Sequence, residues 1–186
     1  MKVSILPSAD GETILTGAHA GRRLFARLIA TAQVPTEPEA AYLDFDGVVV
    51  ATASFLRESV IAFRDYARSS IPNLYPVVAN ASDLVAEELA FFLKHRKDAV
   101  WACHLSSDGK PLEARLLGEL DDTHRDTFDL VARIGLATAP GLAAQSQAGV
   151  APTAWNNRLS FLAGRGLLVE RRAGKTKTFA PVLEIA

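Results

Sequence analysis

The sequence of 186 residues contains one cysteine, Cys103, so no disulfide can form within the chain. A lone cysteine is typical of proteins in a reducing compartment, and we expect the cytoplasm. Cys103 lies in the apolar run 99–105 and is interpreted as a small buried hydrophobic side chain rather than as a nucleophile. The four histidines are scattered along the chain without ligand-like spacing, so we expect no metal site.

Long apolar runs and nucleotide-binding or catalytic motifs are also lacking. No stretch of about 18 uncharged apolar residues is present, so we expect no membrane-spanning segment and no membrane partner. Gly174-Lys175-Thr176 matches only the end of a phosphate-binding loop, because the earlier glycine and the following helix are absent. Asp44 and Asp46 have no accompanying acid, base or nucleophile, and Asp46-Gly47 is interpreted as a turn. We therefore expect neither enzymatic activity nor a cofactor.

Strand-like and helix-like patterns alternate through the first 120 residues. Apolar and β-branched runs predict strands at Val3–Leu6, Tyr42–Val50, Tyr75–Ala79, Ala99–Leu105 and Leu112–Leu120. Helical spacing of apolar residues predicts helices at Ala18–Ala32 and Ala53–Ser70, and a third helix after an N-cap at Ser82. The alternation predicts an α/β fold in which mostly parallel strands are joined by helical crossovers.

The pattern changes after Leu120, which divides the chain into two predicted domains, 1–120 and 121–186. After a capping segment at Asp121–Thr123, the second domain is predicted to contain three helices, a turn and two strands. The helices are expected at His124–Ile134, from Thr138 to about Gln147 and at Ala151–Ala163, with the turn at Ala148–Val150; the strands are expected at Leu167–Arg172 and Lys177–Val182. Three helices followed by a hairpin is the order of elements in a winged helix.

The end of the chain is basic although the whole chain is not. Residues 151–186 contain six bases and two acids, a net charge of +4, whereas the other 150 residues have a net charge of −5. A local basic surface suits a phosphate backbone.

Residues 149–172 resemble the turn, recognition helix and first wing strand of winged-helix transcription regulators such as the MarR and ArsR-type families. The resemblance implies binding to double-stranded DNA. Trp155, Leu159 and Leu162 have the spacing of one buried helix face. Short polar side chains that suit base edges in the major groove lie on the other face: Thr153, Asn156, Asn157 and Ser160. Side chains expected to hold the DNA backbone are Arg158, Arg165, Arg171, Arg172, Lys175 and Lys177. Symmetric operators suggest a homodimer.

Residues 13–105 resemble STAS-like domains of unknown function. The resemblance rests on Gly21-Arg22-Arg23, on Leu43-Asp44-Phe45-Asp46-Gly47-Val48 and on Ser54-Phe55. It implies a mixed sheet with helices that senses a ligand or docks a protein partner. Aligned on Leu43-Asp44, Ser54 falls on the serine that a kinase phosphorylates in anti-sigma-factor antagonists. Ser54 is a phospho-switch on that alignment, or simply an N-cap, which needs only a hydroxyl; we favour the cap.

The two resemblances together predict a transcriptional regulator that binds DNA through its C-terminal winged helix. The alternative is a protein-interaction switch in which the STAS-like half docks a kinase or ATPase and the winged helix is a scaffold. Both hypotheses share the fold class, an α/β domain followed by a winged helix-turn-helix, and they differ in whether DNA is bound.

Overall fold

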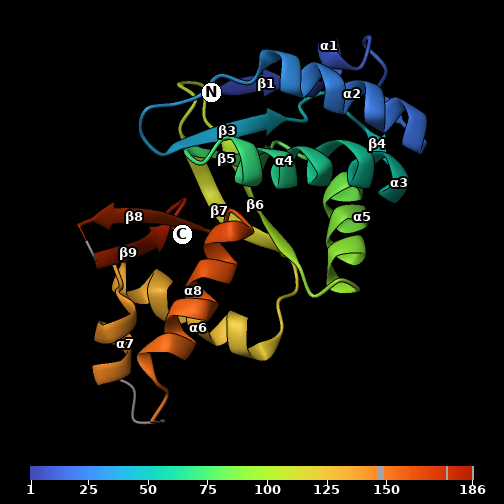
Figure 1. Cartoon of the computed structure of the whole chain (residues 1–186). Helices are drawn as coiled ribbons and strands as arrows, with labels where there is room; N and C mark the ends of the chain where they lie inside the picture. Colours follow the sequence, from blue (N-terminus) through green and yellow to red (C-terminus); the bar gives the residue numbers. More distant parts are fainter. Residues whose placement is uncertain (146–148, 175, 186) are drawn as a thin grey trace.

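The computed structural model describes residues 1–145, 149–174 and 176–185 and has an α/β architecture built on one five-stranded sheet (Figure 1). The sheet order is β1-β3-β5-β6-β7, with strands at Lys2–Ser4, Glu39–Asp44, Leu74–Ala79, Ala99–Leu105 and Pro111–Gly118. The first four strands are parallel, and β7 returns antiparallel to β6 after a turn at Ser106–Gly109. The prediction of an α/β fold with mostly parallel strands is confirmed.

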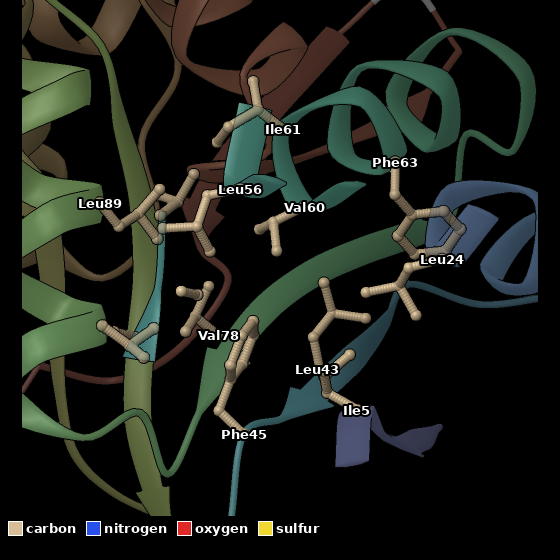
Figure 2. Packing of buried hydrophobic residues seen from close by; sticks show 14 of the residues in the cluster. Ile5, Leu24, Leu43, Phe45, Leu56, Val60, Ile61, Phe63, Val78 and Leu89 are labelled. Carbon is tan, nitrogen blue, oxygen red and sulfur yellow. The ribbon is translucent and has the colours of Figure 1, made fainter. Parts of the chain in front are cut away.

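Helices from the first half cover one face of this sheet. The first is α2 (Ala18–Thr31), and the last is α5 (Asp83–Lys94). Between them in the sequence is one long helix, which consists of α3 (Ala53–Leu56), a π-helical turn (Arg57–Ile61) and α4 (Ala62–Ser70). Because side chains alternate across a strand, Leu43 and Val78 point to this face and pack against Leu24, Leu56 and Leu89 of the helices (Figure 2). Ser82 caps α5 as predicted, since its hydroxyl accepts a hydrogen bond from the Val85 amide at 3.4 Å.

Two strand predictions near the N-terminus are wrong in their limits. The first strand ends at Ser4, and a short helix, α1 (Ile5–Ser8), follows it. The predicted strand 42–50 stops at Asp44, because the turn expected at Asp46-Gly47 interrupts it: the Val48 amide bonds to the Phe45 carbonyl, and Gly47 has a φ of 81°. Of the residues after Asp44, only Val50 is in a strand: it belongs to β4 (Val50–Ala51), which pairs with β2 (Ile14–Leu15) outside the main sheet.

The helix that starts at Ala53 differs from its prediction at its first turn. Thr52, not Ser54, occupies the N-cap, and Ser54 lies inside the helix with its hydroxyl 3.2 Å from the Thr52 hydroxyl. The Glu88 carboxylate accepts a hydrogen bond of 2.9 Å from the Ala53 amide and thereby takes over the role of a cap. The N-cap interpretation of Ser54 is therefore wrong.

The C-terminal segment consists of α6 (Asp122–Ile134), α7 (Ala139–Gln145), α8 (Pro152–Gly164), β8 (Leu168–Ala173) and β9 (Thr176–Pro181). Asp121 caps α6 through its side chain, as the capping segment predicted. Between α6 and α7, Ala137 forms a bridge with Phe179 of β9, so the hairpin is tied to the helices. Residues 146–148 lie outside the described residues. They include the end of the helix expected from Thr138 to about Gln147 and the first residue of the turn expected at Ala148–Val150.

The C-terminal segment covers the opposite face of the sheet. Val77, Ala99 and Trp101 point to this face and share a core with Phe128 of α6 and Leu159 of α8. Trp101 is fully buried, and its ring meets that of Phe128 edge-on, with 5.6 Å between the centroids. The central sheet therefore serves both halves of the chain, and α8 contributes to the core on its second face.

Candidate nucleic-acid interface

Helix α8 buries the apolar face that its sequence predicts. Trp155, Leu159 and Leu162 are at most 6% exposed and belong to the core shared with α6. Pro152 occupies the first turn, where the missing amide hydrogen is not needed. This packing leaves the opposite face of the N-terminal half of α8 available for other contacts.

Three of the four predicted base-reading side chains lie together. Thr153, Asn156 and Asn157 line a depression of about 440 Å³, together with Thr176 and Lys177 at the start of β9. Thr153 and Asn157 are exposed, and Asn156 is half-buried. The depression thus combines short hydrogen-bonding side chains from a helix with a cation from the hairpin.

Ser160, the fourth predicted base-reading residue, lies apart from these three. It lines a separate cleft towards the C-terminal end of α8, which also includes Arg68 and Tyr75 from the first half. Its hydroxyl oxygen is buried and has no hydrogen-bond partner among the described residues. A buried hydroxyl in this cleft is not placed to meet a base edge alongside Asn156 and Asn157.

The predicted backbone-contacting side chains have different surroundings. The Arg158 guanidinium lies over the Trp155 ring, 5.1 Å from its centroid, at the edge of the buried face. Arg171 is exposed and faces away from its neighbour Arg172, because successive residues of a strand point to opposite faces. Lys175 lies outside the described residues, next to Gly174, whose φ of 61° suits the tight turn of the hairpin.

Glu170 neutralises part of the basic hairpin. Its carboxylate is 3.1 Å from Arg172 and 3.0 Å from Lys177. Burial alone would raise the pKa of Glu170, but the hydrogen bonds and charges of Lys177 and Arg172 outweigh burial and lower it. One carboxylate shared by two cations leaves this face of the hairpin with a net positive charge.

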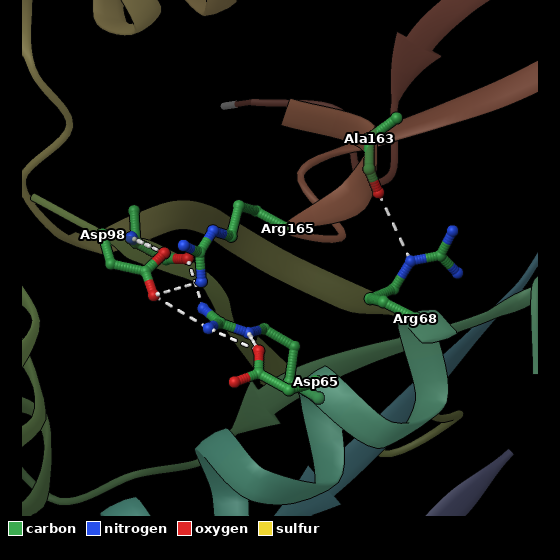
Figure 3. Close-up of polar contacts among 7 residues, drawn as sticks. Asp65, Arg68, Asp98, Ala163 and Arg165 are labelled. Carbon is green, nitrogen blue, oxygen red and sulfur yellow. Dashed lines mark hydrogen bonds and ion pairs between the residues drawn. The ribbon is translucent and has the colours of Figure 1, made fainter. Parts of the chain in front are cut away.

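Arg165 is engaged in a junction between the halves of the chain rather than projecting freely (Figure 3). Its guanidinium is 3.3 Å from Asp98, which also pairs with Arg64 of α4 at 2.8 Å. Asp98 and Arg64 are 3% and 2% exposed, so the pair is buried. Burial lowers the pKa of Arg64, but the Asp98 carboxylate outweighs it and the net pKa is raised. The arginine expected to hold a phosphate thus already has a carboxylate partner.

A second arginine of α4 completes this junction. Arg68 donates a hydrogen bond of 3.3 Å to the Ala163 carbonyl near the end of α8 (Figure 3). It also donates to the carbonyls of Pro72 and Leu74 and lies over the Tyr75 ring, 4.0 Å from its centroid. Sequence reasoning missed Arg64, Arg68 and Asp98, because partners so far apart along the chain leave no local spacing signal.

The candidate residues of the first half are Asp44, Cys103 and Ser54. Asp44 is buried and paired with Lys2 at 2.8 Å, and it accepts a hydrogen bond from Asn80. Cys103 is buried as predicted, and burial raises the pKa of its thiol to about 11, which disfavours the reactive thiolate. Ser54 is half-buried beside Thr52.

Within residues 1–145, 149–174 and 176–185, no group of three or more histidine, cysteine or acidic side chains is arranged to hold a metal ion. No helix in this part of the chain has both the length and the apolar character needed to cross a bilayer. Comparison of the chain with models of protein families, with curated proteins and with solved structures gave no match.

Proposed function

We propose that the chain is a transcriptional regulator that binds double-stranded DNA through a winged helix-turn-helix formed by residues 121–186. The observation that carries the proposal is the depression lined by Thr153, Asn156 and Asn157 next to Lys177 of the hairpin. In helix-turn-helix proteins, residues near the N-terminus of the recognition helix contact the bases. These three side chains occupy that part of α8.

The order and packing of the elements support the same proposal. Helices α6, α7 and α8 precede the β8–β9 hairpin, and the Ala137–Phe179 bridge ties the hairpin to the segment between α6 and α7. We assign α8 to the major groove and the hairpin to the adjacent backbone. Asn156 and Asn157 can each form two hydrogen bonds with adenine, whereas Arg158, Arg171, Arg172 and Lys177 supply charge for phosphates.

The contacts also refine the predicted set of DNA-binding residues. We leave Ser160 out of the base-reading set because its hydroxyl is buried in the other cleft. We leave Arg165 out of the backbone set because it pairs with Asp98. In this proposal the STAS-like first half senses or docks a partner, and the protein binds a symmetric operator as a homodimer.

The test is selection of bound duplexes from a random-sequence pool, followed by anisotropy titration of the enriched duplex. Asn156→Ala and Asn157→Ala should each lower discrimination against mismatched duplexes by about 1–3 kcal/mol per lost base contact. Arg171→Gln should instead weaken binding to all sequences and reduce its salt dependence. Arg96→Gln, an exposed arginine after α5, is the matched control and should change neither.

DNA binding by this surface is refuted if no duplex is enriched and titrations at low salt show the same weak affinity for all these variants.

A second candidate function, protein docking by the first half, is favoured by one observation. Leu84 and Phe91 are 56% and 64% exposed on the same side of α5. That function predicts that Leu84→Ser and Phe91→Ser abolish capture of a protein partner without altering DNA titrations.

A further inference from the structure

The cleft beside the C-terminal end of α8 has walls from both halves of the chain. Arg68, Asn73 and Tyr75 come from the first half, and Ser160, Glu170 and Arg172 come from α8 and β8. Its volume of about 330 Å³ lies within the range of small-molecule sites, which commonly form where two units meet. The cleft is separate from the depression that Asn156 and Asn157 line.

Charge is unbalanced in this α4–α8 cleft. Arg68 is held by three carbonyl oxygens and by the Tyr75 ring, and no carboxylate of the described residues lies within 4 Å of it. Carbonyl dipoles and an aromatic ring orient a guanidinium but do not supply a full counter-charge. Among the described residues, Glu170 is the one carboxylate that lines the cleft, and it pairs with Arg172 and also with Lys177 of the hairpin. The lining of the cleft therefore contains two cations, Arg68 and Arg172, and one anion.

A second observation points to a missing partner in the same place. The Ser160 hydroxyl is buried in the cleft wall without a hydrogen-bond partner among the described residues. Buried hydroxyl groups in folded proteins are nearly always paired, and an exception calls for a bound water, ion or ligand. Burial also lowers the pKa of Arg68, as expected for a desolvated cation that nearby charges do not fully compensate.

We infer that the α4–α8 cleft binds a small molecule that carries a carboxylate or phosphate group. The oxyanion pairs with Arg68 and Arg172, and a rotation of the Ser160 side chain about its Cα–Cβ bond brings the buried hydroxyl to the oxyanion. Guanidinium groups suit this role, because their planar donors match the oxygens of both anions. The inference goes beyond DNA binding and does not depend on it.

The experiment is an NMR titration of the full chain without DNA. Inorganic phosphate and sodium acetate are the probes in separate arms, which distinguish the two anion classes, and sodium chloride at equal ionic strength is the reference. We expect at least one probe to shift the Arg68 Nε–Hε signal and the Ser160 and Gly164 amides saturably, with a single dissociation constant. Chloride should not reproduce this response.

Two mild variants keep the test independent of folding. Arg172→Gln removes an exposed cation, and Ser160→Ala removes a hydroxyl that has no described partner; both should weaken the probe at least several-fold. Arg96→Gln, outside the cleft, should bind the probe like the wild type. The inference is overturned if neither probe acts differently from chloride, or if the dissociation constant is the same in wild type, Arg172→Gln and Ser160→Ala. Because DNA is absent, either result leaves the DNA proposal to its own test.

Discussion

The indole nitrogen of Trp101, in β6, donates a hydrogen bond of 2.9 Å to the main-chain carbonyl of Leu167, which lies just before β8. Trp101 is fully buried between the central sheet and the C-terminal segment. Its ring fills the shared core and its polar atom satisfies a buried carbonyl, so one side chain joins the two halves by both packing and hydrogen bonding.

Replacing each tryptophan by phenylalanine separates these two effects. Trp101→Phe leaves the Leu167 carbonyl without this donor, whereas the Trp155 indole nitrogen has no hydrogen-bond partner among the described residues. Trp101→Phe should therefore lower the free energy of unfolding by about 1–2 kcal/mol more than Trp155→Phe does. Urea denaturation followed by circular dichroism measures both. Equal losses would contradict a stabilising role for this hydrogen bond.

Asp98 and Arg165 should affect stability and DNA binding differently. Asp98→Asn leaves the buried Arg64 without its buried counter-charge and should lower the free energy of unfolding by about 3 kcal/mol. Arg165 is 37% exposed, so Arg165→Gln should lower it by only about 1 kcal/mol. The salt dependence of DNA binding should remain as in the wild type for Arg165→Gln and should fall for Arg171→Gln. A reduced slope for Arg165→Gln would restore this arginine to the phosphate-binding set.

Gly21 allows α2 to approach the helix that begins at Ala53. A Cβ atom at this position would lie 2.6 Å from the Phe55 carbonyl oxygen, which is too close. Gly21→Ala should therefore destabilise the protein by about 1–3 kcal/mol. Gly164, in the last turn of α8, has no atom within 4 Å of such a Cβ. Gly164→Ala should be neutral or stabilising by up to about 1 kcal/mol. Thermal unfolding of both variants tests the predicted close contact.

Asp44 should make stability depend on pH in the acid range. Burial would raise the pKa of Asp44, but hydrogen bonds from Lys2 and Asn80 outweigh it, and the net pKa is lowered. A carboxyl group with a lowered pKa stabilises the folded state above its unfolded pKa of about 3.9, and this stabilisation is lost as pH falls below that value. Asp44→Asn should therefore be less stable than wild type near pH 7, and the difference should shrink on acidification. A constant difference in urea titrations from pH 7 to pH 3 would contradict this cause.

Glu170 should restrain DNA binding by holding two cations. Its carboxylate pairs with Arg172 and Lys177, so Glu170→Gln frees both for phosphates and removes one repulsive charge. We expect several-fold tighter binding to any duplex and a steeper salt dependence. Glu184→Gln, the other acid in the last 36 residues, is the control for net charge alone. Equal effects of the two variants would mean that the pairing itself has no role.

The elements were predictable where local patterns decide them. Strand β6 and the caps of α5 and α6 were predicted from apolar runs and from Ser82 and Asp121, because these signals act within one turn or one strand. The end of the strand expected at 42–50 was predicted wrongly, because the apolar β-branched run in the sequence continues past a turn whose geometry depends on Gly47. The cap of the helix that begins at Ala53 was assigned to Ser54 instead, because the side chain that bonds the Ala53 amide is that of Glu88, far along the chain.

The sequence by itself determined the α/β class, the helix order of the C-terminal segment and the polar face of α8 that includes Asn156 and Asn157. Periodicity and capping are local, so they can be read without knowing which segments meet. Only the tertiary structure decided that Ser160 faces a second cleft and that Arg165 pairs with Asp98. It also decided that Trp101 joins the halves through Leu167. These contacts link residues far apart in the chain, and their partners are set by how the sheet packs on both faces.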